Sequence, residues 1–151
     1  MSKTSQHTYR RRVEFSETDM AGIVHFSNFF RWMEAAEASL FRDLSIPLFQ
    51  ISGDHHGGWP RVRASCSYHA PIYFEDEVEI KLSIKAIKIR AIEYAFRFYK
   101  VTESDKQHIA SGEMTTVFAR KAKEDGKLES MSIPKELLDQ IEDASPEALK
   151  A

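Results

Sequence analysis

The longest periodic pattern in the chain lies over residues 27–44, where apolar side chains recur every three or four positions. Five residues share this spacing: Phe29, Met33, Ala36, Leu40 and Leu44. Such spacing places the side chains along one face of a helix. Pro47 follows the pattern, and proline does not continue a helix. We therefore predict an amphipathic helix over residues 27–44, with Ser27 or Asn28 able to cap its first turn.

Apolar and polar side chains alternate on both sides of this helix, as is typical of strands with one buried face. The alternation predicts strands at residues 9–16, 61–69, 78–84, 92–98 and 108–121. Its phase slips near residues 86–89, where we expect a bulge or bend.

Two further segments depart from the strand pattern. Residues 51–60 contain three glycines and a proline, so they are predicted to form a loop. Residues 134–142 begin on a proline, which suits the first position of a helix, and we predict a short helix there near the C-terminus.

The order of these elements indicates an α+β fold. Strands joined by short turns form an antiparallel meander, and the apolar stripe of one helix can cover one face of such a sheet. The other face must then meet solvent or a second subunit. The chain has 151 residues and shows no repeat, linker or low-complexity segment, so we expect a single domain over residues 1–151.

Composition and charge narrow the function classes. The 21 Lys and Arg residues nearly balance the 23 Asp and Glu residues, which argues against a general nucleic-acid binder. No apolar run approaches the roughly 20 residues that span a bilayer, and residues 1–7 lack the apolar stretch of a signal peptide. A lone cysteine, Cys66, cannot form an intrachain disulfide. We expect a cytoplasmic protein without a nucleic-acid or membrane partner.

The candidate chemistry lies in the turn between the first strand and the helix, which contains Asp19 and Gly22. Amides at a helix start are unpaired and carry partial positive charge, so they can hold the oxyanion formed in acyl transfer. A nearby carboxylate can attack the carbonyl or take a proton from water. This set suffices for thioester hydrolysis, although an aspartate in such a turn can also serve only as a cap. Gly22 either lets the backbone approach the reacting group or only permits the turn.

Two stretches carry a family resemblance. Residues 19–34, DMAGIVHFSNFFRWME, resemble the signature of the 4-hydroxybenzoyl-CoA thioesterase-like group of hotdog proteins. Residues 68–80, YHAPIYFEDEVEI, are similar to the group's Tyr-x-x-Pro turn and acidic strand entry. The resemblance implies a hotdog fold for one thioesterase domain with its core at about residues 8–135. In that fold an antiparallel sheet wraps around one long central helix, here followed by a short C-terminal helix.

The resemblance also implies an activity and an assembly. The chain would hydrolyse an acyl-CoA thioester, with Asp19 as nucleophile or general base and the amides around His25 and Phe26 as the oxyanion hole. Thiolate is a fair leaving group, so no metal or redox cofactor is expected. Subunits of the group join their sheets, so we expect a homodimer or homotetramer with active sites at the subunit boundary. His25 stands one position before the place where some relatives carry a histidine; it could contact substrate, orient water or only line the pocket.

Five residues are candidates for binding substrate. Asn28 could cap the helix or form a hydrogen bond near the carboxylate, and Trp59 could line the acyl pocket. Lys88, Arg90 and Arg120 could bind the phosphates of coenzyme A, or they could be solvated charges at strand ends.

Other readings of the sequence remain open. The same chemistry could release a chain from an acyl carrier protein, and a protein of this fold could bind acyl-CoA without turnover. A hotdog dehydratase would need a catalytic histidine in a different sequence setting. The adjacent His55 and His56 are not spaced to share a metal ion, and Cys66 has no obvious activating base.

Overall fold

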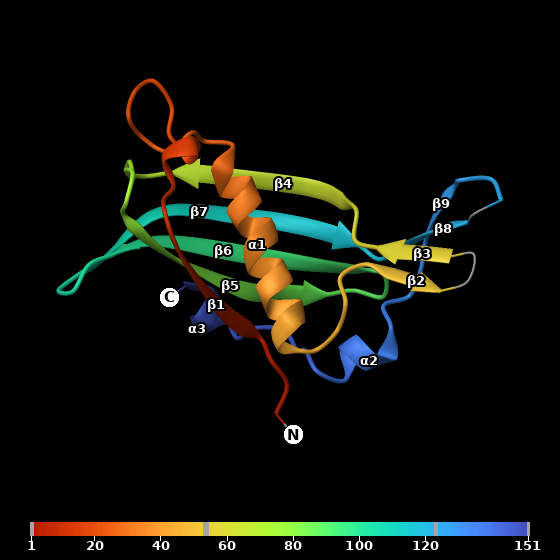
Figure 1. The fold of residues 1–151 in the computed structure, drawn as a ribbon. Coiled ribbons are helices and arrows are strands. Elements are labelled where there is room, and N and C mark those ends of the chain that lie inside the picture. Colours follow the sequence, from red (N-terminus) through yellow and green to blue (C-terminus); the bar gives the residue numbers. More distant parts are fainter. Residues whose placement is uncertain (1, 53–54, 123, 151) are drawn as a thin grey trace.

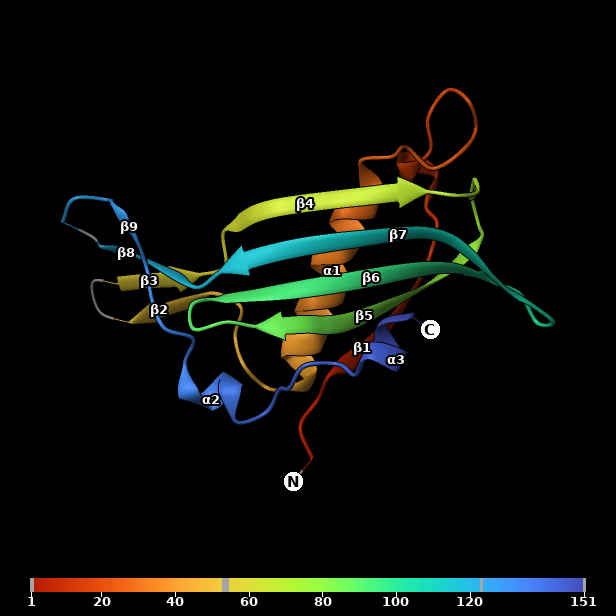
Figure 2. The same cartoon turned by 180° about the vertical axis from the view of Figure 1, so that it is seen from behind.

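Five antiparallel strands form the main sheet of the computed structural model, which describes residues 2–52, 55–122 and 124–150 (Figures 1 and 2). The strands follow the order β1-β5-β6-β7-β4 across the sheet. Their bounds are β1 (Gln6–Arg12), β4 (Arg61–Tyr68), β5 (Glu77–Ile87), β6 (Ala91–Val101) and β7 (Lys106–Val117). The predicted antiparallel meander is therefore confirmed in β5, β6 and β7.

Helix α1 (Asn28–Asp43) confirms the helix predicted from the apolar stripe. Phe29, Met33, Ala36 and Leu40 are each at most 4% exposed, and α1 lies across one face of the sheet, in contact with β1, β4 and β5. The predicted cap is wrong, because in the part of the chain that the structure describes no side-chain hydrogen bond caps the helix, and Ser27 already has helical dihedral angles.

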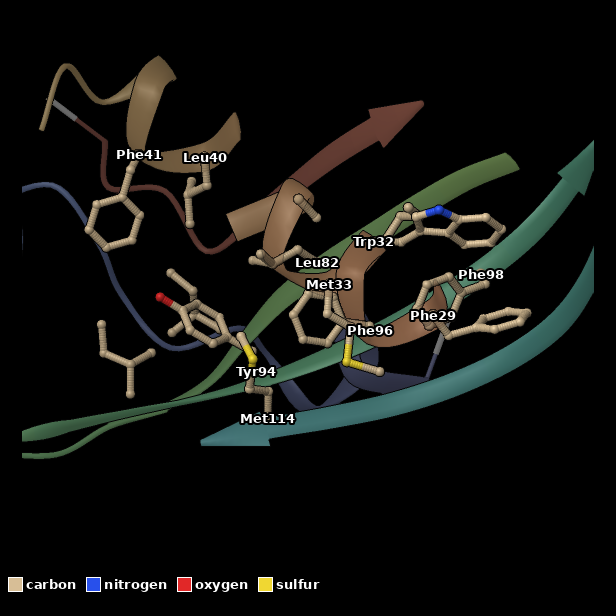
Figure 3. Packing of buried hydrophobic residues seen from close by; sticks show 14 of the residues in the cluster. Phe29, Trp32, Met33, Leu40, Phe41, Leu82, Tyr94, Phe96, Phe98 and Met114 are labelled. Atoms are coloured by element: carbon tan, nitrogen blue, oxygen red, sulfur yellow. The ribbon is translucent and has the colours of Figure 1, made fainter. Parts of the chain in front are cut away.

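The hydrophobic core fills the space between α1 and the sheet (Figure 3). Alternate residues of β6 point into it, so that Tyr94, Phe96 and Phe98 are each at most 1% exposed. On β7, a Cβ atom at Gly112 would lie 2.1 Å from the Met33 Cε atom, so the glycine lets the helix side chain approach the strand closely. The alternation of residues therefore decides which face of the sheet α1 covers.

The N-terminal strand begins and ends earlier than expected. It was predicted at residues 9–16, whereas β1 covers Gln6–Arg12 and a short 3₁₀ helix follows at Phe15–Glu17. The bulge expected near residues 86–89 is present slightly earlier, as a register shift between Ile84 and Ala86 in the β5–β6 pairing.

The prediction of a loop over residues 51–60 is wrong. Strands β2 (Gln50–Ser52) and β3 (His55–Gly58) pair with each other, and β3 also pairs with β8 (Ala119–Ala122). With β9 (Leu128–Ser130) they form a second sheet in the order β2-β3-β8-β9. Strands of three and four residues are too short to show a clear alternation, so the glycines and the proline dominated the prediction from sequence.

The strand predicted over residues 108–121 is divided between the two sheets. Val117 is paired with Ala91, the first residue of β6, and the Phe118 N–H then donates to the Arg90 carbonyl at 2.8 Å, so the pairing with β6 ends here. The chain continues as β8, which pairs with β3 instead.

The C-terminal segment contains less helix than predicted. Helix α2 covers only Lys135–Leu138, after which Ile141 forms a bridge with Thr4 beside β1. A second short helix, α3 (Pro146–Lys150), contacts β5.

A buried ion pair joins the middle of α1 to the start of β4. Glu37 is fully buried, and Arg61 Nη2 donates a hydrogen bond of 2.6 Å to its Oε1. Arg61 Nη1 also donates to the Trp59 carbonyl at 2.8 Å. Burial raises the pKa of Glu37 above its ordinary value, and the Arg61 cation offsets only part of this effect.

The raised pKa of Glu37 leads to a prediction about pH. A carboxyl that binds its proton more tightly when folded stabilises the fold most below its unfolded pKa, which is 4.5 for Glu37, and this contribution is lost as pH rises through the folded pKa. Because Glu37→Gln does not titrate there, the free energy of unfolding of the wild type relative to this variant should fall as the pH rises above 4.5. Urea unfolding at several pH values measures this difference, and a difference that stays constant would contradict the prediction.

Candidate active site

Asp19 lies in a tight turn between the 3₁₀ helix and α1. Its N–H donates to the Ile23 carbonyl at 2.9 Å, and its carbonyl accepts the Gly22 N–H at 3.0 Å. The Ala21 N–H donates to the Asp19 Oδ1 atom at 2.8 Å, while Oδ2 has no protein partner in the described part of the chain. Gly22 has a φ of +86°, and a Cβ atom there would meet nothing within 4 Å. The dihedral angle alone therefore accounts for the glycine.

Glu17, which sequence reasoning did not single out, fastens this turn to α1. Its carbonyl accepts the His25 N–H at 2.9 Å and the Asn28 Nδ2 atom at 2.8 Å. Glu17 is 9% exposed, and its carboxylate accepts hydrogen bonds from Trp32 Nε1 at 2.7 Å and Arg11 Nη2 at 2.6 Å. The turn that holds Asp19 is thus tied to the helix and to β1 through one buried acid.

The amides at the head of α1 are not all available. The His25 N–H is already donated to Glu17, so this part of the expected oxyanion hole is absent. The Phe26 N–H has no acceptor among the described residues, and Phe26 lines the cavity beside Asp19. One unpaired donor therefore remains at the start of a 16-residue helix, where the helix dipole adds partial positive charge.

Two apolar hollows meet at Asp19. A cavity of about 540 Å³ is lined by Asp19 together with Phe26, Phe29, Tyr68 and Ile72. A second hollow of about 530 Å³, on the side of Phe15 and Phe74, also includes Asp19. The carboxylate thus stands between two surfaces that can each receive an apolar group.

His25 and Asn28 do not line the larger cavity. The Nδ1 atom of His25 lies 2.7 Å from the Ser27 hydroxyl, and its ring stacks on Phe26 with the ring centres 4.6 Å apart. Asn28 is 7% exposed, and its side-chain amide binds the Glu17 carbonyl. In this chain Asn28 therefore supports the turn and neither caps the helix nor faces the cavity.

Trp59 and the three basic candidates lie away from Asp19. Trp59 is 8% exposed and packs in the core against Phe41 and Phe118, near the C-terminal end of α1. The other three candidates occupy the β5–β6 turn and β8, at the end of the sheet opposite the Asp19 turn (Figure 1): Lys88, Arg90 and Arg120. The structure of one chain does not bring them to the cavity.

The structure gives no support for a catalytic thiol at Cys66 and describes no metal site. Burial raises the pKa of the Cys66 thiol to about 11, so the reactive thiolate is scarce near neutral pH. The side chains of His55 and His56 lie outside the described residues; within those residues, no group of three or more His, Cys, Asp or Glu could hold a metal ion. In the same part of the chain, no helix is both long and apolar enough to span a membrane.

Asn28→Ala is expected to destabilise the protein by about 1–3 kcal/mol, because a buried hydrogen bond to the Glu17 carbonyl is lost and only the Trp32 side chain still joins Glu17 to α1 among the described residues. Urea unfolding measures the change. Ser27→Ala is a suitable comparison, since the hydrogen-bond partner of the Ser27 hydroxyl among the described residues is the neighbouring His25 ring. Equal free energies of unfolding in the two variants would show that the Asn28 hydrogen bond does not stabilise the fold.

Comparisons with known proteins agree with this geometry. The model of the thioesterase-like superfamily matches residues 13–141. A 4-hydroxybenzoyl-CoA thioesterase of Pseudomonas sp. (strain CBS-3) is 26% identical, over 87% of this chain and 94% of the relative. Its solved structure superposes with a TM-score of 0.77 at 22% identity, covering 91% of this chain and 99% of that one.

A second solved structure is more similar in sequence. The gentisyl-coenzyme A thioesterase BH1999 is 30% identical and superposes with a TM-score of 0.71, covering 87% of this chain and 98% of that chain. These solved neighbours are hotdog-fold thioesterases, and the antiparallel sheet of this chain matches theirs. The chain belongs to the thioesterase-like superfamily.

Proposed function

We propose that this protein hydrolyses an acyl-CoA thioester to the free acid and coenzyme A. The observation that carries the proposal is the pairing of two unoccupied groups beside one apolar cavity: the Oδ2 atom of Asp19 and the N–H of Phe26. A carboxylate and a fixed amide donor are the two groups that hydrolysis of a thioester requires from the protein.

In the proposed mechanism, the thioester carbonyl lies between the two groups. Asp19 attacks the carbonyl carbon itself, or it takes a proton from a water molecule that attacks. The Phe26 N–H donates to the oxyanion that forms, and Gly22 supplies the positive φ that the Asp19 turn requires. The tetrahedral intermediate collapses with coenzyme A leaving as the thiolate. After attack by water this gives the free acid directly, whereas after attack by Asp19 it gives an anhydride that water then hydrolyses to the free acid and the restored carboxylate. Neither a metal nor a redox cofactor is needed for these steps.

Aromatic acyl groups are the first substrates to test. The walls of the cavity include the rings of Phe26, Phe29 and Tyr68, and flat rings pack well against such walls. The related proteins act on 4-hydroxybenzoyl-CoA and gentisyl-CoA according to their names. Short and medium aliphatic acyl groups would also fit an apolar cavity of this size.

The proposed active unit contains at least two copies of the chain, either a homodimer or a homotetramer. Strand β4 is the last strand of its sheet, and every residue of it except Cys66 is exposed. An unpaired edge of this kind can continue into the sheet of a second copy, with each sheet wrapped around its own α1 as the central helix. The second copy is needed if Lys88, Arg90 and Arg120 are to bind the phosphates of a substrate held at Asp19, because they lie far from Asp19 within one chain.

We also propose that the whole of residues 1–151 forms one domain that works in the cytoplasm. His25 is placed in this scheme beside the Phe26 amide and not as a required catalyst, because its ring nitrogen is held by Ser27.

Thiol release from a panel of aromatic and aliphatic acyl-CoAs tests the proposal. Turnover of at least one of them, lost in Asp19→Asn, is the expected result. Binding of acyl-CoA without turnover by the folded wild type would instead favour a sensor. If the protein hydrolyses only thioesters carried on an acyl carrier protein, its substrate is the carrier-bound chain and not acyl-CoA.

A further inference from the structure

The Phe26 amide is held in place by hydrogen bonds to the groups on either side of it. On one side, the His25 carbonyl, which belongs to the same peptide unit as the Phe26 N–H, accepts the Asn28 N–H at 3.0 Å. On the other side, the Phe26 carbonyl accepts the Phe29 N–H at 3.3 Å and the Tyr68 hydroxyl at 3.1 Å. Both bonds are longer than the usual lengths, which are about 2.9–3.0 Å for N–H···O and about 2.7–2.8 Å for O–H···O. The two groups therefore hold this carbonyl together, and the hydroxyl oxygen is the closer of the two.

Tyr68 reaches the helix start from a distant part of the chain. It is the last residue of β4, 42 positions after Phe26. Its ring packs edge-to-face against Phe29, with the ring centres 5.0 Å apart, and it lines the same cavity as Asp19. Within residues 2–52, 55–122 and 124–150, the other bonds to the Phe26 and His25 carbonyls come from α1 itself, and Tyr68 links these carbonyls to the sheet.

We propose that Tyr68 is a positioning residue for the oxyanion donor: its hydroxyl fixes the Phe26 carbonyl and thereby the direction of the Phe26 N–H. The proposal rests on the proposed thioesterase function for its kinetic consequence. A donor stabilises an oxyanion only when it is aimed at the place where the charge develops. Two fixed carbonyls, one on each side of the Phe26 Cα atom, leave the N–H little freedom to turn away.

The hydroxyl acts through Phe26 and not on the substrate. A phenol has one proton to donate, and in Tyr68 that proton is directed to the Phe26 carbonyl. Desolvation, followed by the nearby Cys66, raises the pKa of Tyr68 to about 12. The phenol therefore remains a donor at every pH at which an enzyme of this kind would be assayed.

Tyr68→Phe tests the proposal, since it removes the hydroxyl and keeps the ring against Phe29. With a substrate that the wild type turns over, kcat should fall about tenfold, because a misdirected donor loses part of its stabilisation of the transition state, while KM should stay within about twofold. The reduction should be equal at each pH between about 6 and 9, because no proton of Tyr68 is exchanged in this range. A kcat that stays at the wild-type value, whether or not KM rises, would overturn the proposal.

Tyr73→Phe is the matched control. Tyr73 is 46% exposed, lies five residues further along the chain, and its hydroxyl has no hydrogen-bond partner among the described residues. Its variant should keep the wild-type kcat and KM. An equal loss in both variants would also overturn the proposal.

A measurement without substrate separates this proposal from the proposed function. In ¹⁵N-labelled protein, the Phe26 amide resonance should shift and its hydrogen exchange should become faster in Tyr68→Phe and not in Tyr73→Phe. If the wild type turns over no thioester, the thioesterase proposal fails, while the amide resonance still decides whether Tyr68 positions Phe26. An unchanged resonance would overturn the positioning role even in an active enzyme.

Discussion

Replacement of Asp19 by asparagine is expected to lower kcat by about 10³-fold, within the range for the loss of a general base. Asparagine keeps the size of the side chain and an oxygen that can accept the Ala21 N–H, so the turn should persist. It has no negative charge with which to attack the carbonyl or to take a proton from water. Thiol release measured under saturating substrate, together with KM, gives the effect on the chemical step.

Asp105→Asn is the control for this substitution. Asp105 lies in the exposed turn between β6 and β7, and its side chain has no partner in the described part of the chain. The control should retain full activity, and both variants should unfold at the wild-type temperature. If Asp19→Asn retains more than about a tenth of the wild-type kcat, Asp19 is neither nucleophile nor base.

A single turnover in ¹⁸O-labelled water tests for direct attack by Asp19. Direct attack places an acyl group on the carboxylate, and hydrolysis of that anhydride at the aspartyl carbon leaves label in Asp19. Attack by water on the thioester, and hydrolysis of the anhydride at the acyl carbon, both leave the label only in the released acid. Label in Asp19 would therefore establish the nucleophilic route.

Replacement of Arg61 by methionine is expected to lower the free energy of unfolding by about 3 kcal/mol, at the low end of the range for breaking a buried ion pair. The variant leaves the Glu37 carboxylate fully buried without its cation. The effect is not larger because the Arg61 side chain is 29% exposed and because Glu37 can take up a proton. For the same reason, the loss should be greater at pH 8 than at pH 5, and urea unfolding at both pH values measures it.

Arg63→Met is the matched control on the same strand, because Arg63 is exposed and has no ion pair among the described residues. It should change the stability by less than about 0.5 kcal/mol. The double variant Glu37→Leu with Arg61→Met removes both charges and should recover most of the lost stability. If the double variant is as unstable as Arg61→Met alone, the buried charge of Glu37 is not the cause.

The spacing of residues in α1 indicates that Glu37 is buried, in addition to predicting the helix itself. It lies four residues after Met33 and three before Leu40, inside the apolar stripe of the helix, so its burial was available from spacing alone. Its partner was not, because Arg61 lies 24 residues away on a strand whose position relative to α1 depends on the whole sheet. The sequence indicates a charge that needs a partner, and only the packing selects the partner.

In the Asp19 turn, too, local sequence patterns predict part of the structure and tertiary contacts decide the rest. The small turn residues around Gly22 and the apolar stripe after it are local patterns, and they place a carboxylate before a helix without any tertiary information. Which amide stays free was not predictable, because it depends on the Glu17 carbonyl that takes the His25 N–H. Tyr68 was visible as part of a motif, but its contact with Phe26 joins residues 42 positions apart.

The sequence by itself determined the elements whose periods are regular and local: the helix over Asn28–Asp43, the strands β4 to β7, and the turn with Asp19 and Gly22. Only the tertiary structure decided the second sheet, the division between β7 and β8, and the network of Glu17 and Tyr68 around Phe26. The physical reason is the range of the interactions. Side-chain periodicity acts within a few residues, whereas a hydrogen bond requires only that two groups meet in space, however far apart they stand in the chain.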